Sequence, residues 1–340
     1  MAADAVGAIL LAAVTLYAVL AGADFGGGLW DLLAGRTLTG QAPRDLIDES
    51  ITPVWEANHV WLIFSLVIFW TGFPDAFASV MTAAALPLWL AVGGIVLRGA
   101  GFAFRKEISR LSLERVAGAT FAFSSMLTPF FMGTVVGGIA AGRVSANASH
   151  ARLSVWTSPT SLLMGFLFVA ACGYLAAVYL IGEAVRRADA AMEKYFRRRA
   201  QLSAIVAGAL SLVTLAVLHD SNRVIFDRLA TGRALPLVVL TGVCGLAVLL
   251  LVSSGRIAGV RAIAALGVAA VVWGWGVAQY PVLLPGTAVT VSNAGSPHST
   301  MVALIVLAIA TVVLVGPAFL LLFHLQSRRQ LSLLDHPSSE

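Results

Sequence analysis

Apolar runs of about twenty residues follow one another along most of the chain, separated by short stretches with Gly, Pro or charged residues. An α-helix needs roughly 20 apolar residues to cross a bilayer, and in hydrocarbon its backbone groups must be satisfied within the segment. The pattern therefore predicts membrane-spanning helices, and it lacks the alternation typical of barrel strands. We predict nine spans, at residues 6–33, 51–70, 76–97, 117–140, 162–181, 202–218, 235–252, 260–280 and 300–323.

The connections between these runs are too short for a separate soluble unit. We expect a single membrane domain over residues 1–340, with four helices at about 6–140, four at about 159–281 and a ninth at about 300–323. The first run has no basic segment before it and no convincing cleavage site after it, so we interpret it as a retained span. Residues 41–50 mix charged and apolar positions, which predicts a short interfacial helix before the second span.

Composition narrows the class further. The chain is 59% hydrophobic and only 11% charged, with a mean hydropathy of +0.90, which excludes an ordinary soluble domain. The net charge of +5 does not indicate nucleic-acid binding, because the basic residues lie between apolar runs rather than along one polar face. Of the 22 lysines and arginines, 17 fall in the connections after odd-numbered spans, in the C-terminal tail, or, for Arg261, within two residues of such a connection. This bias predicts an external N-terminus and a cytoplasmic C-terminus.

Two acidic residues fall inside predicted spans, Asp24 and Glu56. A carboxylate at membrane depth costs a few kcal/mol, so it usually faces protein or water and often belongs to a functional path. Tyr17, Asp24 and Asp31 recur every seven residues with small residues between them, which predicts a polar stripe that faces protein. We expect Asp24 and Glu56 to share a depth near the cytoplasm, where buried carboxylates can cycle protons. The residues alone leave open a purely structural role, in which both acids hold helices together through hydrogen bonds.

The segment from residue 53 to residue 61 carries the densest chemistry in the chain, including Trp55, Glu56, Asn58, His59 and Trp61. Glu56 and His59 are i,i+3 neighbours, a spacing also found in metal and haem sites, but the chain has no second Glu-x-x-His pair to complete a di-metal bundle. A polar network is the favoured interpretation, and we expect no metal site. A lone membrane histidine is more often a hydrogen-bonded core residue than an axial ligand.

Small residues and cysteines predict packing rather than chemistry. Gly26 to Gly28 and Gly93-Gly94 follow no strand, so they indicate close helix contact instead of phosphate binding. Cys172 and Cys244 each lie inside an apolar run, which favours packing over a disulfide or a thiolate metal cluster.

Several motifs, in order and spacing, resemble subunit II of the cytochrome bd-type quinol oxidases, and together they extend over nearly the whole chain. The block around Glu56 is the most specific of them. The motifs are Gly22-Ala23-Asp24-Phe25-Gly26-Gly27-Gly28, Pro53-Val54-Trp55-Glu56-Ala57-Asn58-His59-Val60-Trp61, Phe73-Pro74-Asp75, Leu97-Arg98-Gly99, Phe102-Ala103-Phe104-Arg105 and Tyr280-Pro281-Val282-Leu283-Leu284-Pro285.

The resemblance implies an all-α fold of two four-helix bundles plus one peripheral helix, paired with a haem-bearing subunit I in the bacterial inner membrane. Such a complex oxidises membrane quinol and reduces dioxygen to water, and it takes protons from the cytoplasm without pumping. Low-spin haem b, high-spin haem b and haem d are expected in subunit I, and none in this chain. The resemblance leaves open a small accessory subunit and a structural quinone or lipid.

The resemblance also implies roles for individual residues. Glu56 matches the acid of a hydrophilic proton channel and Asp24 the acid of the first-helix motif, with Asn58 and His59 beside them. Trp61 matches an aromatic residue near the proposed oxygen passage, and no catalytic residue is expected in this chain. The family often has Asp at position 56 and Glu or Gln at position 59, so the form found here leaves the details of proton handling open.

Two other functions are compatible with the pattern. Intramembrane acids, small-residue packing and a proline within a span, Pro129, are also features of secondary transporters, although the chain shows no inverted repeat. An assembly or scaffold protein with no part in proton transfer is the third candidate.

Overall fold

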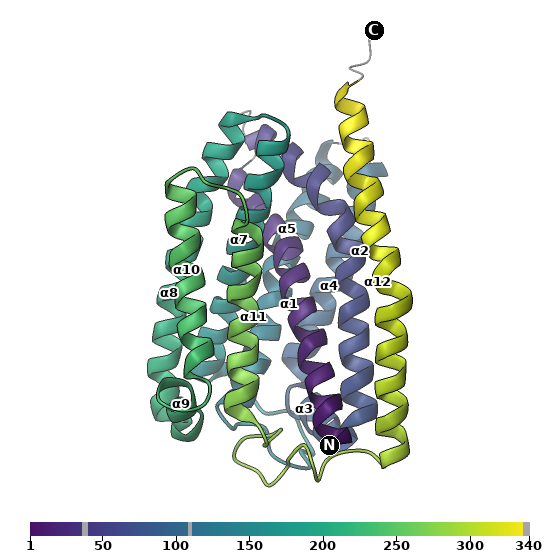
Figure 1. Ribbon diagram of the computed structural model, residues 1–340, viewed down its shortest axis with the longest axis vertical. Helices are drawn as coiled ribbons and strands as arrows, with labels where there is room; N and C mark the ends of the chain where they lie inside the picture. The colour runs from purple at the N-terminus through teal and green to yellow at the C-terminus, as the bar shows by residue number, and fades with distance from the viewer. Residues whose placement is uncertain (36–39, 108–110, 336–340) are drawn as a thin grey trace.

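The computed structural model describes residues 1–35, 40–107 and 111–335, and within these it leaves the side chains of residues 51–57, 102–117, 318–320 and 322–335 outside the description. The described chain is almost entirely helical (Figure 1). Its helices are α1 (Ala2–Ala34), α2 (Gln41–Gly72), α3 (Pro74–Ala83), α4 (Ala85–Glu107), α5 (Leu111–Ala140), α6 (Ser154–Thr157), α7 (Pro159–Arg186), α8 (Ala190–Ser221), α9 (Arg223–Ala230), α10 (Leu235–Ser253), α11 (Val260–Gln279) and α12 (His298–Asp335).

Eight of the nine predicted spans each fall within or largely overlap one of these helices, and two boundaries differ. The run at residues 76–97 is divided between α3 and α4, which meet at Ala84. Residues 41–50 are helical as predicted, but they form the first turns of α2, which runs without a break from Gln41 to Gly72, rather than a short helix of their own. Leu46 and Ile47 are buried in the same cluster as residues of α7. This packing extends the apolar face of α2 toward its N-terminus, before residue 51, where the charges suggested that the span begins.

Within the described residues, seven helices are long and apolar enough to cross a membrane. They are Ala2–Ala34, Gly118–Ala140, Pro159–Arg186, Ala190–Ser221, Leu235–Ser253, Val260–Gln279 and His298–Pro317. The pair Asn58–Gly72 and Pro74–Ala83 is bent by 117° and brings the number to eight if it forms one broken span, while the apolar helix Ala85–Gly101 is shorter. A multi-pass membrane protein is therefore supported, whereas nine spans in two four-helix bundles stays a prediction.

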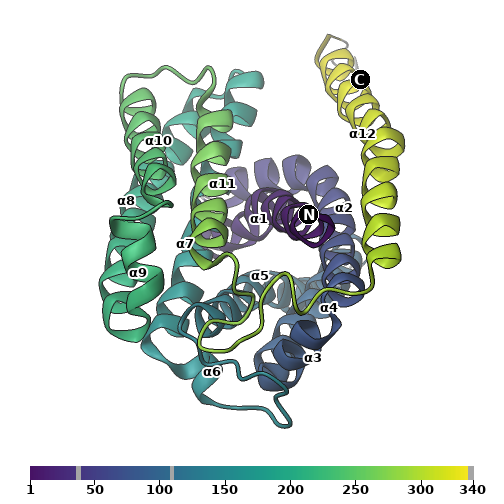
Figure 2. The same ribbon diagram turned by 60° about the horizontal axis from the view of Figure 1, so that its bottom comes forward.

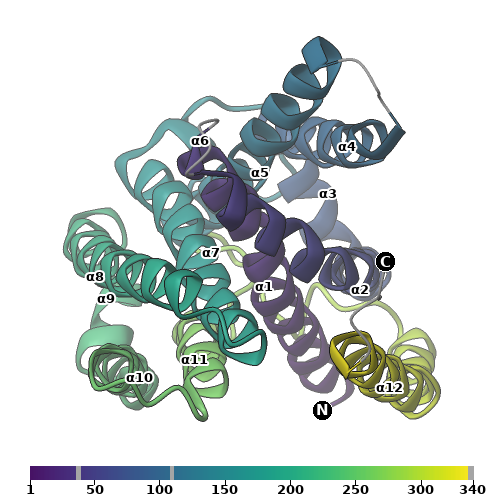
Figure 3. The same ribbon diagram turned by 90° about the horizontal axis from the view of Figure 1, so that it is seen from above.

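Helix α1 lies at the centre of the arrangement. It contacts α2, α5, α7, α11 and α12, and the view from above places it between α2 and α7 (Figure 3). Its polar stripe is confirmed to face protein, because Tyr17, Asp24 and Asp31 are all buried. This position brings the acid of α1 within reach of several neighbouring helices.

Glycines allow these helices to approach closely. A Cβ at Gly26 would collide with the backbone carbonyl oxygen of Cys172 on α7, and one at Gly28 would collide with the side chain of Ser125 on α5. Gly94 of α4 meets Thr128 of α5 in the same way. The predicted role is confirmed for these three glycines. It is wrong for Gly93, where an added Cβ would meet nothing within 4 Å.

Four helices lie at the sides of the molecule. Helices α8, α9 and α10 lie on one side of the molecule and α12 on the other (Figure 2). The N-terminus lies at the lower end in Figure 1, and α12 extends to the upper end. Cys172 of α7 and Cys244 of α10 are both buried, and both are free thiols.

Candidate functional site

A buried ion pair joins α1 to α4 in the interior of the molecule. The guanidinium of Arg98 pairs with Oδ1 of Asp24, and the two side chains are 1% and 0% exposed. Arg98 Nη2 also donates to the backbone carbonyl of Asp24 at 3.0 Å, and Nη1 donates to Oγ of Ser125 on α5. Two charges removed from water persist only when their remaining hydrogen-bonding groups find partners, and these contacts supply most of them.

Aromatic rings complete the surroundings of the guanidinium. The Cζ atom of Arg98 lies 5.0 Å from the ring centroid of Phe25 and 4.5 Å from that of Phe121. A desolvated arginine gains about 2 kcal/mol from such a cation–π contact. The cation is therefore fixed by a carboxylate, a hydroxyl and two ring faces, contributed by α1 and α5.

Helix α2 supplies the second partner of the carboxylate. Asn58, which is fully buried, donates from Nδ2 to Oδ2 of Asp24 at 2.6 Å. Both oxygens of Asp24 thus accept hydrogen bonds, one from Arg98 and one from Asn58. Within the described part of the chain, Oδ1 of Asn58 and Nε of Arg98 are buried without a hydrogen-bond partner. These atoms give the cluster a free acceptor and a free donor.

The predicted site residues are therefore brought together in part. Asp24 and Asn58 are in direct contact, and His59 follows Asn58 on α2. Glu56 belongs to α2, two residues before Asn58, but its side chain lies outside the described residues. Its predicted position beside Asp24 stays a prediction.

Trp61 lies on α2 next to the same face of α1. It is partly buried and packs against the cluster formed by Tyr17, Ala21, Phe25 and Cys172. Its ring meets that of Phe64 edge to face, with centroids 5.8 Å apart. The indole therefore packs on the buried face of α1 that also carries Asp24.

Arg98 was missed by the sequence analysis, which placed it in a connection just beyond the span at residues 76–97. The structure corrects this, because α4 continues to Glu107 and the Arg98 side chain is buried. The sequence held only a weak signal: Arg98 is flanked by apolar and small residues on both sides, and acids within a membrane often pair with a base. Ser125 carried no comparable signal.

A second buried acid was also missed, beyond the predicted end of the span at residues 162–181. Glu183 of α7 is 2% exposed and accepts a hydrogen bond from Nη2 of Arg261 on α11 at 2.8 Å. The same Nη2 donates to the backbone carbonyl of Tyr179 at 2.6 Å, and Arg186 also pairs with Glu183. This cluster ties α7 to α11 at a helix end, which indicates a structural role.

Possible metal ligands do not gather into a cluster in the part of the chain that the structure describes. No group of three or more His, Cys, Asp or Glu side chains in the described ranges comes close enough to hold a metal ion. The polar groups beside His59 are buried and bonded to one another.

The fold and the site define a class, an all-α multi-pass membrane protein with an acid, an arginine and an amide buried together among its helices. The family model described as "Cytochrome bd terminal oxidase subunit II" matches residues 3–326, and the chain belongs to that family. This assignment confirms the resemblance found in the motifs, and it favours an oxidase subunit over a secondary transporter.

Individual relatives agree with the family. The chain is 26% identical over 155 residues to cytochrome bd ubiquinol oxidase subunit 2 of Bacillus subtilis (strain 168), an alignment that covers 45% of each protein. It is 24% identical over 201 residues to cytochrome bd-I ubiquinol oxidase subunit 2 of Escherichia coli (strain K12), which covers 59% of this chain and 52% of the relative. The alignments thus span about half the length of these curated relatives.

A solved structure supports the fold. The chain superposes on a chain of the bd oxidase from Geobacillus thermodenitrificans with a TM-score of 0.77, covering 96% of this chain and 98% of the other. The sequence identity is 22%. The helical arrangement is therefore shared over nearly the full length of both chains.

Proposed function

We propose that this chain is subunit II of a cytochrome bd-type oxidase that oxidises membrane quinol and reduces dioxygen to water. The haem groups, two of type b and one of type d, reside in a partner subunit I, and this chain supports that partner without ligating iron. The observation that carries the proposal is the family match over residues 3–326.

The second part of the proposal is a proton path from the cytoplasm that includes Glu56, Asp24, Asn58 and His59. Each electron that reduces dioxygen to water is accompanied by one proton, so the complex needs a route for protons that does not also leak them. The hydrogen bond from Asn58 to Asp24, with His59 next to Asn58 on α2, supports a polar cluster at this place.

Arg98 determines which acid of the cluster can take up and release a proton. Its charge pairs with Asp24, so a proton that arrives at Asp24 must displace the ion pair. Glu56, two residues before Asn58 on α2, is then the group that cycles, and Asp24 with Arg98 holds the local charge balance. The free acceptor on Asn58 and the free donor on Arg98 can hydrogen-bond to water and extend the path.

Trp61 is proposed to line the oxygen passage. Its partly buried indole packs against an apolar cluster beside the polar one, and dioxygen is an apolar molecule that travels through such surroundings. The orientation follows the distribution of basic residues, with the N-terminus outside and the C-terminus in the cytoplasm of a bacterial cell.

The complex itself is tested by a reduced-minus-oxidised absorption spectrum. A complex purified from membranes through a tag on this chain is expected to show haem b and haem d bands and to contain a larger second subunit. A fully active, haem-free preparation of this chain alone would contradict the oxidase assignment.

The proton path is tested with Glu56→Gln. The expected product is an assembled, haem-replete complex with quinol-dependent oxygen consumption lowered at least tenfold, since general acid–base groups contribute about 10²–10⁴-fold where they act. Asp220→Asn is the matched control, because this exposed acid lies outside the cluster. Normal turnover of Glu56→Gln would refute the path, and loss of the complex would indicate a structural duty for Glu56 instead.

A further inference from the structure

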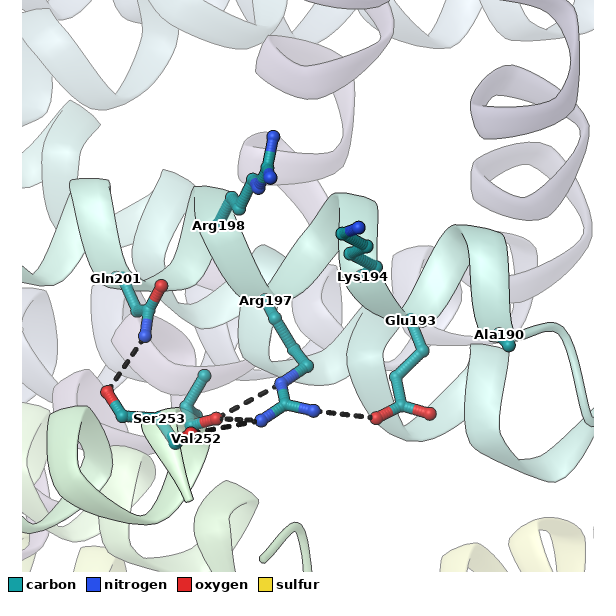
Figure 4. A pocket seen from close by; sticks show the side chains of 8 residues that line it. All are labelled: Ala190, Glu193, Lys194, Arg197, Arg198, Gln201, Val252 and Ser253. Carbon is teal, nitrogen blue, oxygen red and sulfur yellow. Dashed lines mark hydrogen bonds and ion pairs between the residues drawn. The ribbon is translucent and has the colours of Figure 1, made fainter. Parts of the chain in front are cut away.

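A pocket of about 500 Å³ lies where the first turns of α8 meet the end of α10 (Figure 4). Its floor is fixed by hydrogen bonds between the two helices. Arg197 donates from Nε to the carbonyl oxygen of Val252 at 3.0 Å, and Gln201 donates to Oγ of Ser253 at 2.9 Å. These hydrogen bonds between α8 and α10 therefore hold the lining of the pocket in place.

The pocket carries an excess of positive charge. Glu193 is paired with Arg197 at 3.2 Å, which leaves Lys194 and Arg198 as uncompensated cations in the lining. Both side chains are exposed, and neither makes a hydrogen bond or an ion pair to another residue in the described ranges. Figure 4 shows them extending from the same side of α8, one turn apart. Like charges at this spacing repel each other unless an anion lies between them.

Two exposed apolar stripes begin at this pocket. Residues four, seven and fourteen positions after Arg198 share its face of α8, and residues three, seven and ten positions before Ser253 share its face of α10. These residues are the exposed Leu202, Ile205 and Leu212 on α8 and Leu250, Leu246 and Val243 on α10. A basic pocket at the end of exposed apolar surface on both helices matches a molecule with an anionic head and hydrocarbon chains.

We propose that this pocket binds the phosphate headgroup of an anionic phospholipid, whose acyl chains lie along α8 and α10. Lys194 and Arg198 contact the phosphate as donors and cations, and Gln201 borders it. Basic residues near a membrane surface attract anionic lipids, and the pocket adds a fixed geometry to this general attraction. The site lies apart from the Asp24 cluster and does not depend on the proposed proton path.

The test uses the complex purified through a tag on this chain, measured by native mass spectrometry. Dioleoylphosphatidylglycerol is added to wild type and to the double variant Lys194→Gln/Arg198→Gln. We expect the affinity for this lipid to fall about fivefold for each charge removed, the factor that corresponds to about 1 kcal/mol per basic residue near an anionic surface. Dioleoylphosphatidylcholine is expected to bind weakly to both proteins.

The matched control is Arg44→Gln/Arg256→Gln. It removes the same charge near the same end of the helices, from residues that do not line the pocket. Unchanged haem spectra and unfolding temperatures in lipid-free detergent are expected for both double variants, because all four side chains make no hydrogen bond or ion pair to other described residues.

Three outcomes would overturn the proposal. Equal loss of lipid in both double variants would show general surface attraction without a site. Displacement of the lipid by millimolar inorganic phosphate would show an anion site that does not recognise lipid. Cross-linking of residues on the α8 and α10 stripes to a protein partner in the membrane would show that the surface belongs to an interface.

Discussion

Arg98 brings a positive charge to the carboxylate of Asp24 at a place where neither side chain is accessible to water. Replacing one member of a buried ion pair leaves an uncompensated charge, which costs about 3–5 kcal/mol. We therefore expect Arg98→Gln to lower the free energy of unfolding by about that amount. The midpoint of denaturant-induced unfolding of the purified complex measures it.

The double variant Asp24→Asn/Arg98→Gln is the control for this prediction. It removes both charges, so it should recover most of the lost stability while the contacts with Phe25 and Phe121 are still weakened. A double variant as unstable as Arg98→Gln would show that packing of the guanidinium, rather than its charge, is what stabilises the cluster.

The sequence predicts one half of this cluster and not the other. Asp24 stands out because it lies in the middle of an apolar run, and the seven-residue spacing with Tyr17 and Asp31 shows which face it occupies. Arg98 lies where an apolar run ends, and arginines at such places usually extend to the membrane surface. Whether it extends outward or turns inward depends on the packing of α4 against α1 and α5, which hydropathy does not encode.

Helices α1 and α7 meet through Gly26, and this close approach is an element-scale requirement of the site. We expect Gly26→Ala to destabilise the complex by about 1–3 kcal/mol, the usual cost of overpacking. The added methyl group would collide with a backbone carbonyl on α7, which cannot rotate away as a side chain would. The yield of assembled complex and its thermal unfolding midpoint measure the effect.

Gly93→Ala provides the matched comparison within the same protein. An added Cβ there meets no atom within 4 Å, so the variant should assemble and unfold like wild type. Equal losses from Gly26→Ala and Gly93→Ala would mean that helix flexibility, rather than close contact, explains the glycines.

The positions of the helices could largely be predicted from the sequence, but the residues at which they begin and break could not. The long apolar runs give α1, α5, α7, α8, α10, α11 and α12 directly, because membrane helices are recognised by length and composition alone. The break at Ala84 lies three residues before Pro87, which has no N–H to donate back to the carbonyl of Ala83. A proline does not by itself fix such a break, because Pro129 lies inside the continuous helix α5. The start of α2 carries several charges yet is unbroken, and there packing decides, since Leu46 and Ile47 are buried together with residues of α7.

For the whole molecule, the sequence predicts a membrane protein with many spans but does not settle how they are grouped. Exposed leucines and valines on α8, α10 and α12 look the same whether lipid or a partner subunit covers them. Lipid tails are as apolar as these side chains, so hydrophobicity gives no ranking of helix partners. Glycine contacts and buried polar pairs identify partners instead, chiefly between α1 and its neighbours and between α5 and α7.

The last prediction concerns which ends of the helices face the cytoplasm and which face the outside of the cell. His150 is exposed in the connection between α5 and α6, and Ala190 is exposed at the start of α8. If the basic residues set the orientation, His150 lies outside the cell and Ala190 lies in the cytoplasm. In intact cells with a permeabilised outer envelope, a membrane-impermeant maleimide should label His150→Cys. It should label Ala190→Cys only after the cells are broken. The native Cys172 and Cys244 are buried and should give a low background.

The reverse labelling pattern would invert the orientation, and it would move the proposed proton uptake to the outer face. Labelling of both variants in intact cells would contradict a bilayer between these two ends.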